Sequence, residues 1–127
     1  MAAPPAVVRP MSAEDAILLE RRGGLGLVTL NRPEALNTLS LAIYRRFDAA
    51  LAAWAEDPAV RAVVVRGAGG RAFCAGGDVV AIYAAYRQGG AIADFFREEY
   101  QLIRRVHRFP KPYVALMDGI TMGGGAG

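Results

Sequence analysis

Residues 67–78 read GAGGRAFCAGGD, a glycine-rich stretch that follows the apolar run from Ala62 to Val65. This β-branched run predicts a strand of the kind that is buried on both faces in a layered α/β protein. A second run with the same character, Tyr113 to Met117, also precedes glycine-rich sequence, from Gly119 to Gly127. Glycine lets a ligand approach backbone N–H groups closely, and ligands of α/β sheets gather where strands end. We therefore expect the two segments to supply one N–H each to a shared anion.

Other interpretations of these segments remain open. Either segment taken alone is equally well explained as a turn, and the last one as a flexible tail. A nucleotide site fits less well, because the last segment lacks the Lys-Ser/Thr ending of a P-loop. Neither segment gives a Gly-x-Gly-x-x-Gly pattern in the required strand-to-helix context with a following acidic residue.

The rest of the chain predicts alternating strands and helices. Two strands, over residues 16–20 and 25–30, flank a turn. A helix begins after Ser40 as N-cap and ends at Asp57, with one apolar face made of Ile43, Phe47, Leu51 and Trp54. Helices are also expected over 79–86 and 91–107, the second with an apolar stripe of Ile92, Phe95, Phe96, Ile103 and Val106. This order is typical of the α/β class.

Composition narrows the functional classes. The 127 residues fit one folded domain, expected over 14–127 after a disordered lead-in over 1–13. The net charge of +3 comes from scattered arginines, which argues against nucleic acid as a partner. Cys74 is the one cysteine, so neither an internal disulfide nor a cysteine metal cluster is expected. No run approaches the roughly 20 apolar residues of a membrane span, so no membrane partner is expected.

Glu99 is the most informative single residue, because it lies on the apolar stripe of its helix, four positions from both Phe95 and Ile103. A carboxylate there either points into a polar cavity as an acid or base, or pairs with an arginine such as Arg104 or Arg105. Glu98 lies off the stripe and is expected to be solvated.

Three further polar residues are given structural roles. Asp78 stands at a helix start, where capping is favoured over catalysis. Cys74 has no basic neighbour in sequence and is expected to be a packed residue rather than a nucleophile. His107, at a helix end, is expected to interact with the helix dipole or to lie at the surface.

Five segments together resemble the enoyl-coenzyme A hydratase/isomerase (crotonase) superfamily. They are VTLNRPEALN at 28–37, GAGGRAFCAGGD at 67–78, FFREEY at 95–100, KPYVAL at 111–116 and GITMGGGAG at 119–127. The last three are most similar to the branch that hydrolyses 3-hydroxyisobutyryl-coenzyme A. The resemblance implies a crotonase-like α/β fold of ββα spiral repeats, of which this chain is the N-terminal portion.

The resemblance also implies site residues. The backbone N–H groups of Gly77 and Gly124 would form an oxyanion hole for the thioester carbonyl, and Glu99 would contact the substrate. The other implied contacts to the acyl-coenzyme A are Ala75, Gly76, Asp78, Ala35 and Leu36. Coenzyme A is part of the substrate, so no separate cofactor and no metal are implied, and a homo-oligomer is possible.

Two departures from the family pattern refine the expectation. Gly127 stands where hydratases carry a catalytic glutamate. Its lack of a carboxylate favours a thioester hydrolase over an enoyl-coenzyme A hydratase. Family members continue beyond this point, so we expect a truncated domain whose 127 residues are inactive alone and fold poorly because of an uncovered sheet edge.

The alternatives to the hydrolase are a hydratase or isomerase, and an inactive fragment that binds acyl-coenzyme A. A bacterial cytoplasm is the expected location, with the mitochondrial matrix as the alternative in a eukaryote.

Overall fold

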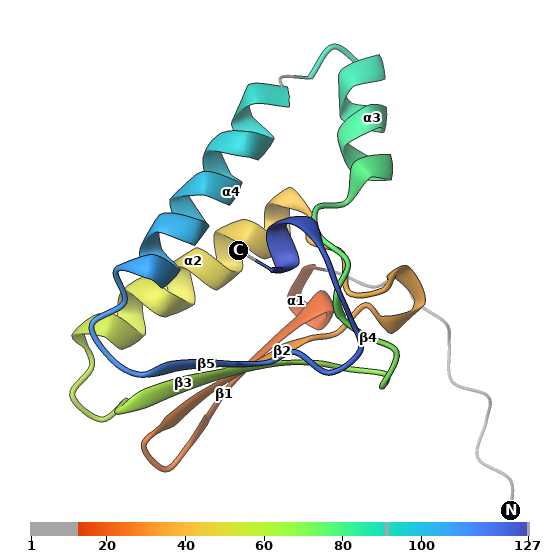
Figure 1. Ribbon diagram of the computed structural model, residues 1–127. Coiled ribbons are helices and arrows are strands. Elements are labelled where there is room, and N and C mark those ends of the chain that lie inside the picture. The colour runs from red at the N-terminus through yellow and green to blue at the C-terminus, as the bar shows by residue number, and fades with distance from the viewer. Residues whose placement is uncertain (1–12, 91, 127) are drawn as a thin grey trace, which may run out of the picture.

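A four-stranded sheet with helices packed on one face organises the molecule (Figure 1). The computed structural model describes residues 13–90 and 92–126. The predicted lead-in, apart from Ala13, therefore lies outside the described residues.

The large sheet contains β1 (Ile17–Arg22), β2 (Leu25–Leu30), β3 (Ala62–Gly67) and β5 (Tyr113–Leu116), in the order β1-β2-β3-β5. β1 and β2 form an antiparallel hairpin, whereas β2, β3 and β5 run parallel. A second, two-stranded sheet pairs β4 (Ala72–Cys74) in parallel with β6 (Ile120–Thr121). The predicted α/β class is confirmed.

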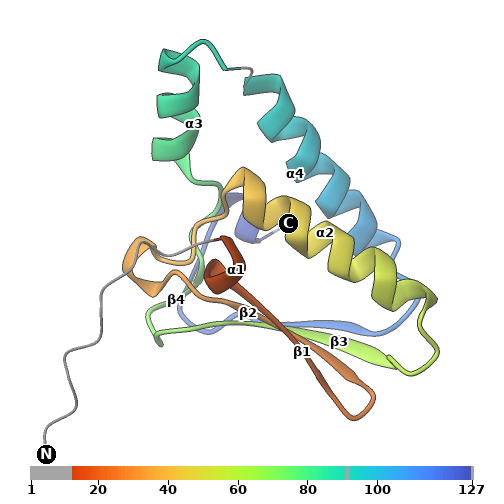
Figure 2. The same cartoon turned by 180° about the vertical axis from the view of Figure 1, so that it is seen from behind.

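The helices are α1 (Ala13–Ala16), α2 (Leu41–Glu56), α3 (Val79–Arg87) and α4 (Ile92–His107), with short 3₁₀ turns η1 (Pro33–Ala35) and η2 (Gly123–Gly125). Seen from both sides, α2 and α4 lie over the same face of the large sheet, and α3 projects beyond it (Figures 1 and 2). The η2 turn lies next to α2, where the Tyr44 hydroxyl is 3.2 Å from the Cβ position of Gly124.

Helix α2 matches its prediction closely. The Ser40 hydroxyl caps it by accepting a hydrogen bond from the Ile43 N–H at 3.3 Å, and all four predicted core residues are buried. At its end the Trp54 ring covers β2 at Gly26, where an added Cβ would lie 2.7 Å from the ring. Burying this apolar face against the sheet stabilises both elements.

The expected burial of the strands on both faces is wrong. In β3, Val63 and Val65 are fully buried under the helices, while Val64 between them is half-buried. In β5, Val114 and Leu116 are 47% and 51% exposed. Alternate side chains of a strand point to opposite faces, and among the described residues helices cover only one of them. β5 is also the edge strand of this sheet.

The predicted stripe of α4 is correct in part. Phe95 is buried, but Phe96 is 43% exposed and Leu102, absent from the predicted stripe, is buried. Asp48 of α2 ties the two helices together by accepting hydrogen bonds from Gln101 and Arg105 at 3.1 and 2.5 Å. These contacts set the face that α4 turns toward α2, and Phe96 lies outside it.

Candidate functional site

The two glycine-rich segments meet at the ends of the small sheet. The N–H of Met122 donates to the Cys74 carbonyl at 3.0 Å, which continues the pairing of β6 with β4. A Cβ built on Gly76 would lie 3.2 Å from the Met122 carbonyl oxygen and 3.5 Å from the Gly124 nitrogen. The segments follow β4 and β6 rather than β3 and β5 directly, because each contains a short strand of its own that sequence reasoning missed.

Two backbone N–H groups are left free where the segments meet. Among the described residues, neither the Gly77 N–H nor the Gly124 N–H donates a hydrogen bond. Their neighbours are bonded: the Asp78 N–H donates to the Leu39 carbonyl and the Gly125 N–H to the Met122 carbonyl, each at 2.9 Å. Unpaired donors held by a bonded framework are the arrangement that stabilises a developing oxyanion.

The segment around η1 lies against the first glycine loop. The Ala75 N–H donates to the Leu36 carbonyl at 3.0 Å, and the Leu39 N–H donates to the Gly76 carbonyl at 2.9 Å. Ala35 and Leu36, far away in sequence, are thereby held beside Ala75 and Gly76. The structure brings these four predicted substrate contacts together.

Asn37 holds these segments together through hydrogen bonds. It was not identified from the sequence. It is 1% exposed, and its side-chain amide donates to the carbonyls of Ala68 and Ala72 at 3.0 and 2.9 Å. Its side-chain oxygen accepts from the Arg32 N–H at 2.8 Å. The available signal was a polar residue within a short stretch bounded by Leu36 and Leu39, since a buried amide must satisfy its hydrogen bonds.

Glu99 reaches from α4 toward the second glycine loop. It is half-buried, and a Cβ built on Gly124 would overlap its Oε1 atom. Among the described residues Glu99 forms no ion pair, because Arg105 pairs with Asp48 instead. The alternative of an arginine pair for Glu99 is therefore wrong. So is the solvated state expected for Glu98, which pairs with Arg45 at 3.2 Å and is 24% exposed in its side chain.

Tyr44 of α2 is the other polar side chain at this place, and sequence reasoning missed it. It is 1% exposed, and its hydroxyl is 3.2 Å from the Cβ position of Gly124 and 3.6 Å from that of Gly77. Burial, followed by the nearby Glu99 carboxylate and Cys74, raises the pKa of Tyr44 well above its usual range. The hydroxyl therefore stays protonated and able to donate.

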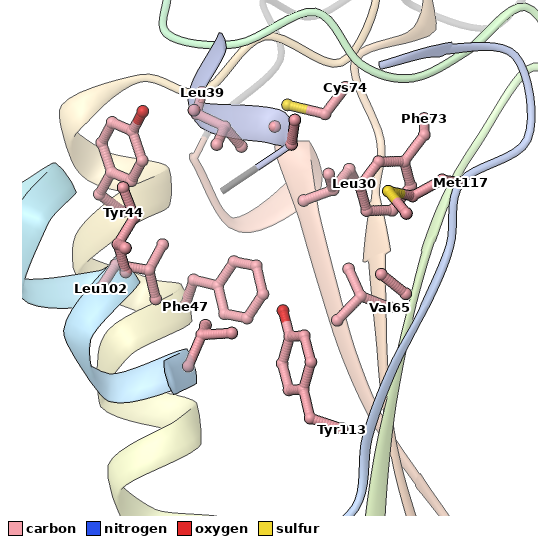
Figure 3. Close-up of a pocket in the computed structure, with 16 residues that line it drawn as sticks. Leu30, Leu39, Tyr44, Phe47, Val65, Phe73, Cys74, Leu102, Tyr113 and Met117 are labelled. Atoms are coloured by element: carbon pink, nitrogen blue, oxygen red, sulfur yellow. The ribbon is translucent and has the colours of Figure 1, made fainter. Parts of the chain in front are cut away.

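A cavity of about 250 Å³ opens beside Gly124 (Figure 3). Its wall runs from Gly124 along α2 and α4 to the sheet, and most of the lining is apolar: Leu30, Leu39, Phe47, Val65, Phe73 and Leu102. Figure 3 shows the Tyr113 hydroxyl pointing across the cavity toward Phe47. Burial raises the pKa of Tyr113. Such a space suits a small, mainly apolar group with a polar end.

The remaining candidate residues take the structural roles expected of them. Asp78 caps α3 by accepting from the Ala81 N–H at 3.0 Å, and it also pairs with Arg32 at 3.1 Å. Cys74 is buried, which raises the pKa of its thiol, although a hydrogen bond with the Gly76 backbone opposes this. His107 is exposed in the last turn of α4.

Metal-ligating clusters and membrane-spanning helices are both absent from the described part of the chain. Over residues 13–90 and 92–126, no group of three or more His, Cys, Asp or Glu side chains is arranged to hold a metal ion. None of the helices in these two ranges combines the length and the apolar character needed to cross a membrane.

Comparison with known proteins shows what the chain is similar to. The family model described as Enoyl-CoA hydratase/isomerase matches residues 25–127. The chain is 52% identical over 111 residues to the mitochondrial 3-hydroxyisobutyryl-CoA hydrolase of Xenopus tropicalis, covering 87% of this chain and 29% of the relative. The Homo sapiens protein of the same name is 49% identical over 116 residues, covering 91% and 30%. The chain thus spans about 30% of the length of these curated relatives.

Solved structures show the same similarity. A carnitinyl-CoA dehydratase from Mycobacterium thermoresistibile superposes with a TM-score of 0.83 at 52% identity, over 88% of this chain and 33% of that one. An enoyl-CoA hydratase from Rhodobacter sphaeroides 2.4.1 superposes with a TM-score of 0.82 at 45% identity, over 87% and 33%. The described residues correspond to a portion of each of these folds.

Proposed function

The chain belongs to the enoyl-CoA hydratase/isomerase family, and from this premise we propose that it carries the oxyanion-binding part of a 3-hydroxyisobutyryl-CoA hydrolase. The reaction adds water to the thioester carbonyl, breaks the carbon–sulfur bond, and releases coenzyme A and the free hydroxy acid, a step of valine breakdown. One observation carries the proposal: Gly77 and Gly124 each have an unpaired N–H where the two glycine loops meet, and the Glu99 carboxylate lies next to Gly124.

In this proposal, water attacks the thioester carbon and the carbonyl oxygen becomes an oxyanion. The Gly77 and Gly124 N–H groups bind that oxygen, and losing one such donor typically costs about 100- to 1000-fold in rate. The attacking water gives up one proton, and the sulfur leaves as a thiolate that takes up one proton, so the net reaction consumes one water. Glu99 orients the attacking water or the hydroxyl of the substrate. Any further acid or base comes from outside the described residues.

The substrate contacts follow from the loops around these groups. Backbone from Ala35, Leu36, Ala75 and Gly76 would hold the coenzyme A moiety, and the apolar cavity would accept the short branched acyl chain. Asp78 would act indirectly, because its carboxylate already caps α3 and pairs with Arg32.

Location and assembly belong to the same proposal. The two curated relatives named above are mitochondrial proteins, which supports the mitochondrial-matrix alternative more than the bacterial cytoplasm. A homo-oligomer stays a prediction.

Hydration or isomerisation of an enoyl-CoA is the second candidate, favoured by the similarity to solved hydratase and dehydratase structures. Gly127 at the position of the hydratase glutamate argues against it. The two chemistries are easily separated, because hydration leaves the thioester intact and hydrolysis releases a thiol.

The test is thiol release from 3-hydroxyisobutyryl-CoA, measured for these 127 residues and for the longest product of the gene. We expect Glu99→Ala to lower kcat/KM at least about 100-fold, because it removes the carboxylate that orients the attacking water or the substrate hydroxyl. Glu98→Ala is the matched control, since it removes the adjacent carboxylate, which pairs with Arg45; it should change kcat/KM less than about threefold.

Equal losses in both variants would remove Glu99 from the mechanism and leave the hydrolase standing. Two other outcomes would contradict the hydrolase. Hydration of crotonyl-CoA without thiol release would establish the second candidate. Binding of acyl-CoA with neither reaction, in the longest product as well, would establish the inactive binding protein.

A further inference from the structure

We propose that Tyr44 is a positioning residue for Glu99, whose carboxylate accepts a hydrogen bond from the Tyr44 hydroxyl and is thereby held beside Gly124. The catalytic consequence rests on the proposed function, whereas the contact itself is a property of the fold.

The first support is an unsatisfied buried hydroxyl. Among the described residues, the Tyr44 hydroxyl is the one buried side-chain polar atom that meets no partner at full hydrogen-bond geometry. Leaving such a group unpaired is costly, and phenylalanine would fill the same space without that cost. A hydroxyl kept in a fully buried position indicates an acceptor within reach.

The second support is the position of the hydroxyl. The Cβ position of Gly124 is 3.2 Å from the Tyr44 hydroxyl and closer still to the Glu99 Oε1 atom, so the two groups approach the same point. The Tyr44 ring is held edge-on against Phe95 with centroids 5.3 Å apart, and Phe95 in turn lies 3.0 Å from the Cβ position of Gly77.

The third support is the lack of a competing acceptor. On α2 and α4, the carboxylates of Asp48 and Glu98 are occupied by Arg105 and Arg45. From the first glycine loop the nearby titratable group is Cys74, a weak acceptor. Glu99 is therefore the anionic acceptor that faces Tyr44. The neutral, protonated state of this tyrosine keeps its O–H available.

The kinetic test compares Tyr44→Phe, Glu99→Gln and the double variant in the longest product of the gene. Tyr44→Phe should lower kcat roughly tenfold, with KM changed less than about twofold, as expected for losing one hydrogen bond to a charged group. In the Glu99→Gln background the same substitution should cause no further loss, because coupled residues are not additive.

Stability separates positioning from a packing role. Tyr44→Phe keeps the ring and removes the hydroxyl, and the half-buried Glu99 carboxylate that loses this donor can bind water instead, so the Tm should change little. Tyr100→Phe is the control: Tyr100 follows Glu99 in sequence, is 66% exposed, and should keep both kcat and Tm. A lower Tm for Tyr44→Phe, together with an equal kcat loss in the Glu99→Gln background, would overturn the proposal.

A measurement without substrate distinguishes failure of this proposal from failure of the proposed function. With 3-fluorotyrosine at position 44, the ¹⁹F resonance should move on Glu99→Gln, while a label at position 100 should move less. If the wild-type protein releases no thiol and the position-44 resonance still moves, the hydrolase fails and the contact stands. An unmoved resonance overturns the contact whatever the activity.

Discussion

The glycine-rich stretch at 67–78 contains two regions that look alike in sequence and differ in structure. At Gly67, an added Cβ would lie 2.6 Å from the carbonyl oxygens of both Ala72 and Phe73, and the Asn37 amide closes the same turn. At Gly76 and Gly77, the chain instead borders the second glycine loop and leaves an N–H unpaired. Glycine serves packing in the first region and access to backbone donors in the second.

The difference shows that a glycine-rich motif is not one functional unit. Substitutions in the turn should act on stability with little effect on chemistry, and substitutions beside the free N–H groups should do the reverse. Three alanine variants separate these effects.

The largest effect is expected for Gly124→Ala. Its Cβ would occupy the space of the Glu99 Oε1 atom and approach the Tyr44 hydroxyl at 3.2 Å. Displacing a reacting group by about an ångström can cost about 100-fold in rate, so thiol release should fall by roughly that factor. The Tm should change little, because the flexible end of Glu99 can move. A large loss of Tm with normal kcat per folded molecule would assign Gly124 to packing instead.

The second-largest effect is expected for Gly67→Ala, which should lower stability. No rotation of a side chain relieves contact with two backbone carbonyls, so the turn must shift, at a cost of about 3 kcal/mol. Thermal unfolding followed by circular dichroism should show Tm lower by about 10 °C. The folded fraction should retain its kcat. An unchanged Tm would mean that the turn is far softer than its contacts indicate.

The smallest effect is expected for Gly70→Ala. This variant is also the control for Gly67→Ala, because both residues lie in the same turn. A Cβ at Gly70 meets nothing within 4 Å, but its φ of +74° is left-handed. Conformational strain alone should cost about 1 kcal/mol, visible as a Tm shift of a few degrees with normal activity. If both variants lose equal stability, crowding at Gly67 is not the main cause of the loss.

Much of the fold could be predicted because local patterns determined it. Helix α2 carries a cap, an apolar face and a stop signal that agree with one another, and the structure follows all three. Burial of β5 could not be predicted in this way. An apolar run such as Tyr113 to Met117 shows that a strand forms, but not which neighbours cover each face, and this depends on elements distant in sequence.

The site residues also differ in whether local sequence patterns could identify them. Glu99 could be found from its position on an apolar stripe, because helix periodicity is local. Tyr44 and Asn37 could not, since a tyrosine or an asparagine among apolar residues has many possible partners. Their roles depend on the tertiary approach of α4 to α2 and of the β4 loop to η1.

Helix α3 has no buried residue, and Gly89 and Gly90 separate it from α4. Its opening therefore breaks few apolar contacts, while opening α2 exposes the core of the sheet. We therefore expect the two helices to belong to different cooperative units in hydrogen exchange, with amides in α3 exchanging through local opening and those in α2 through global unfolding. The Asp78 cap, with its link to Arg32, joins α3 to the loop that presents Gly77.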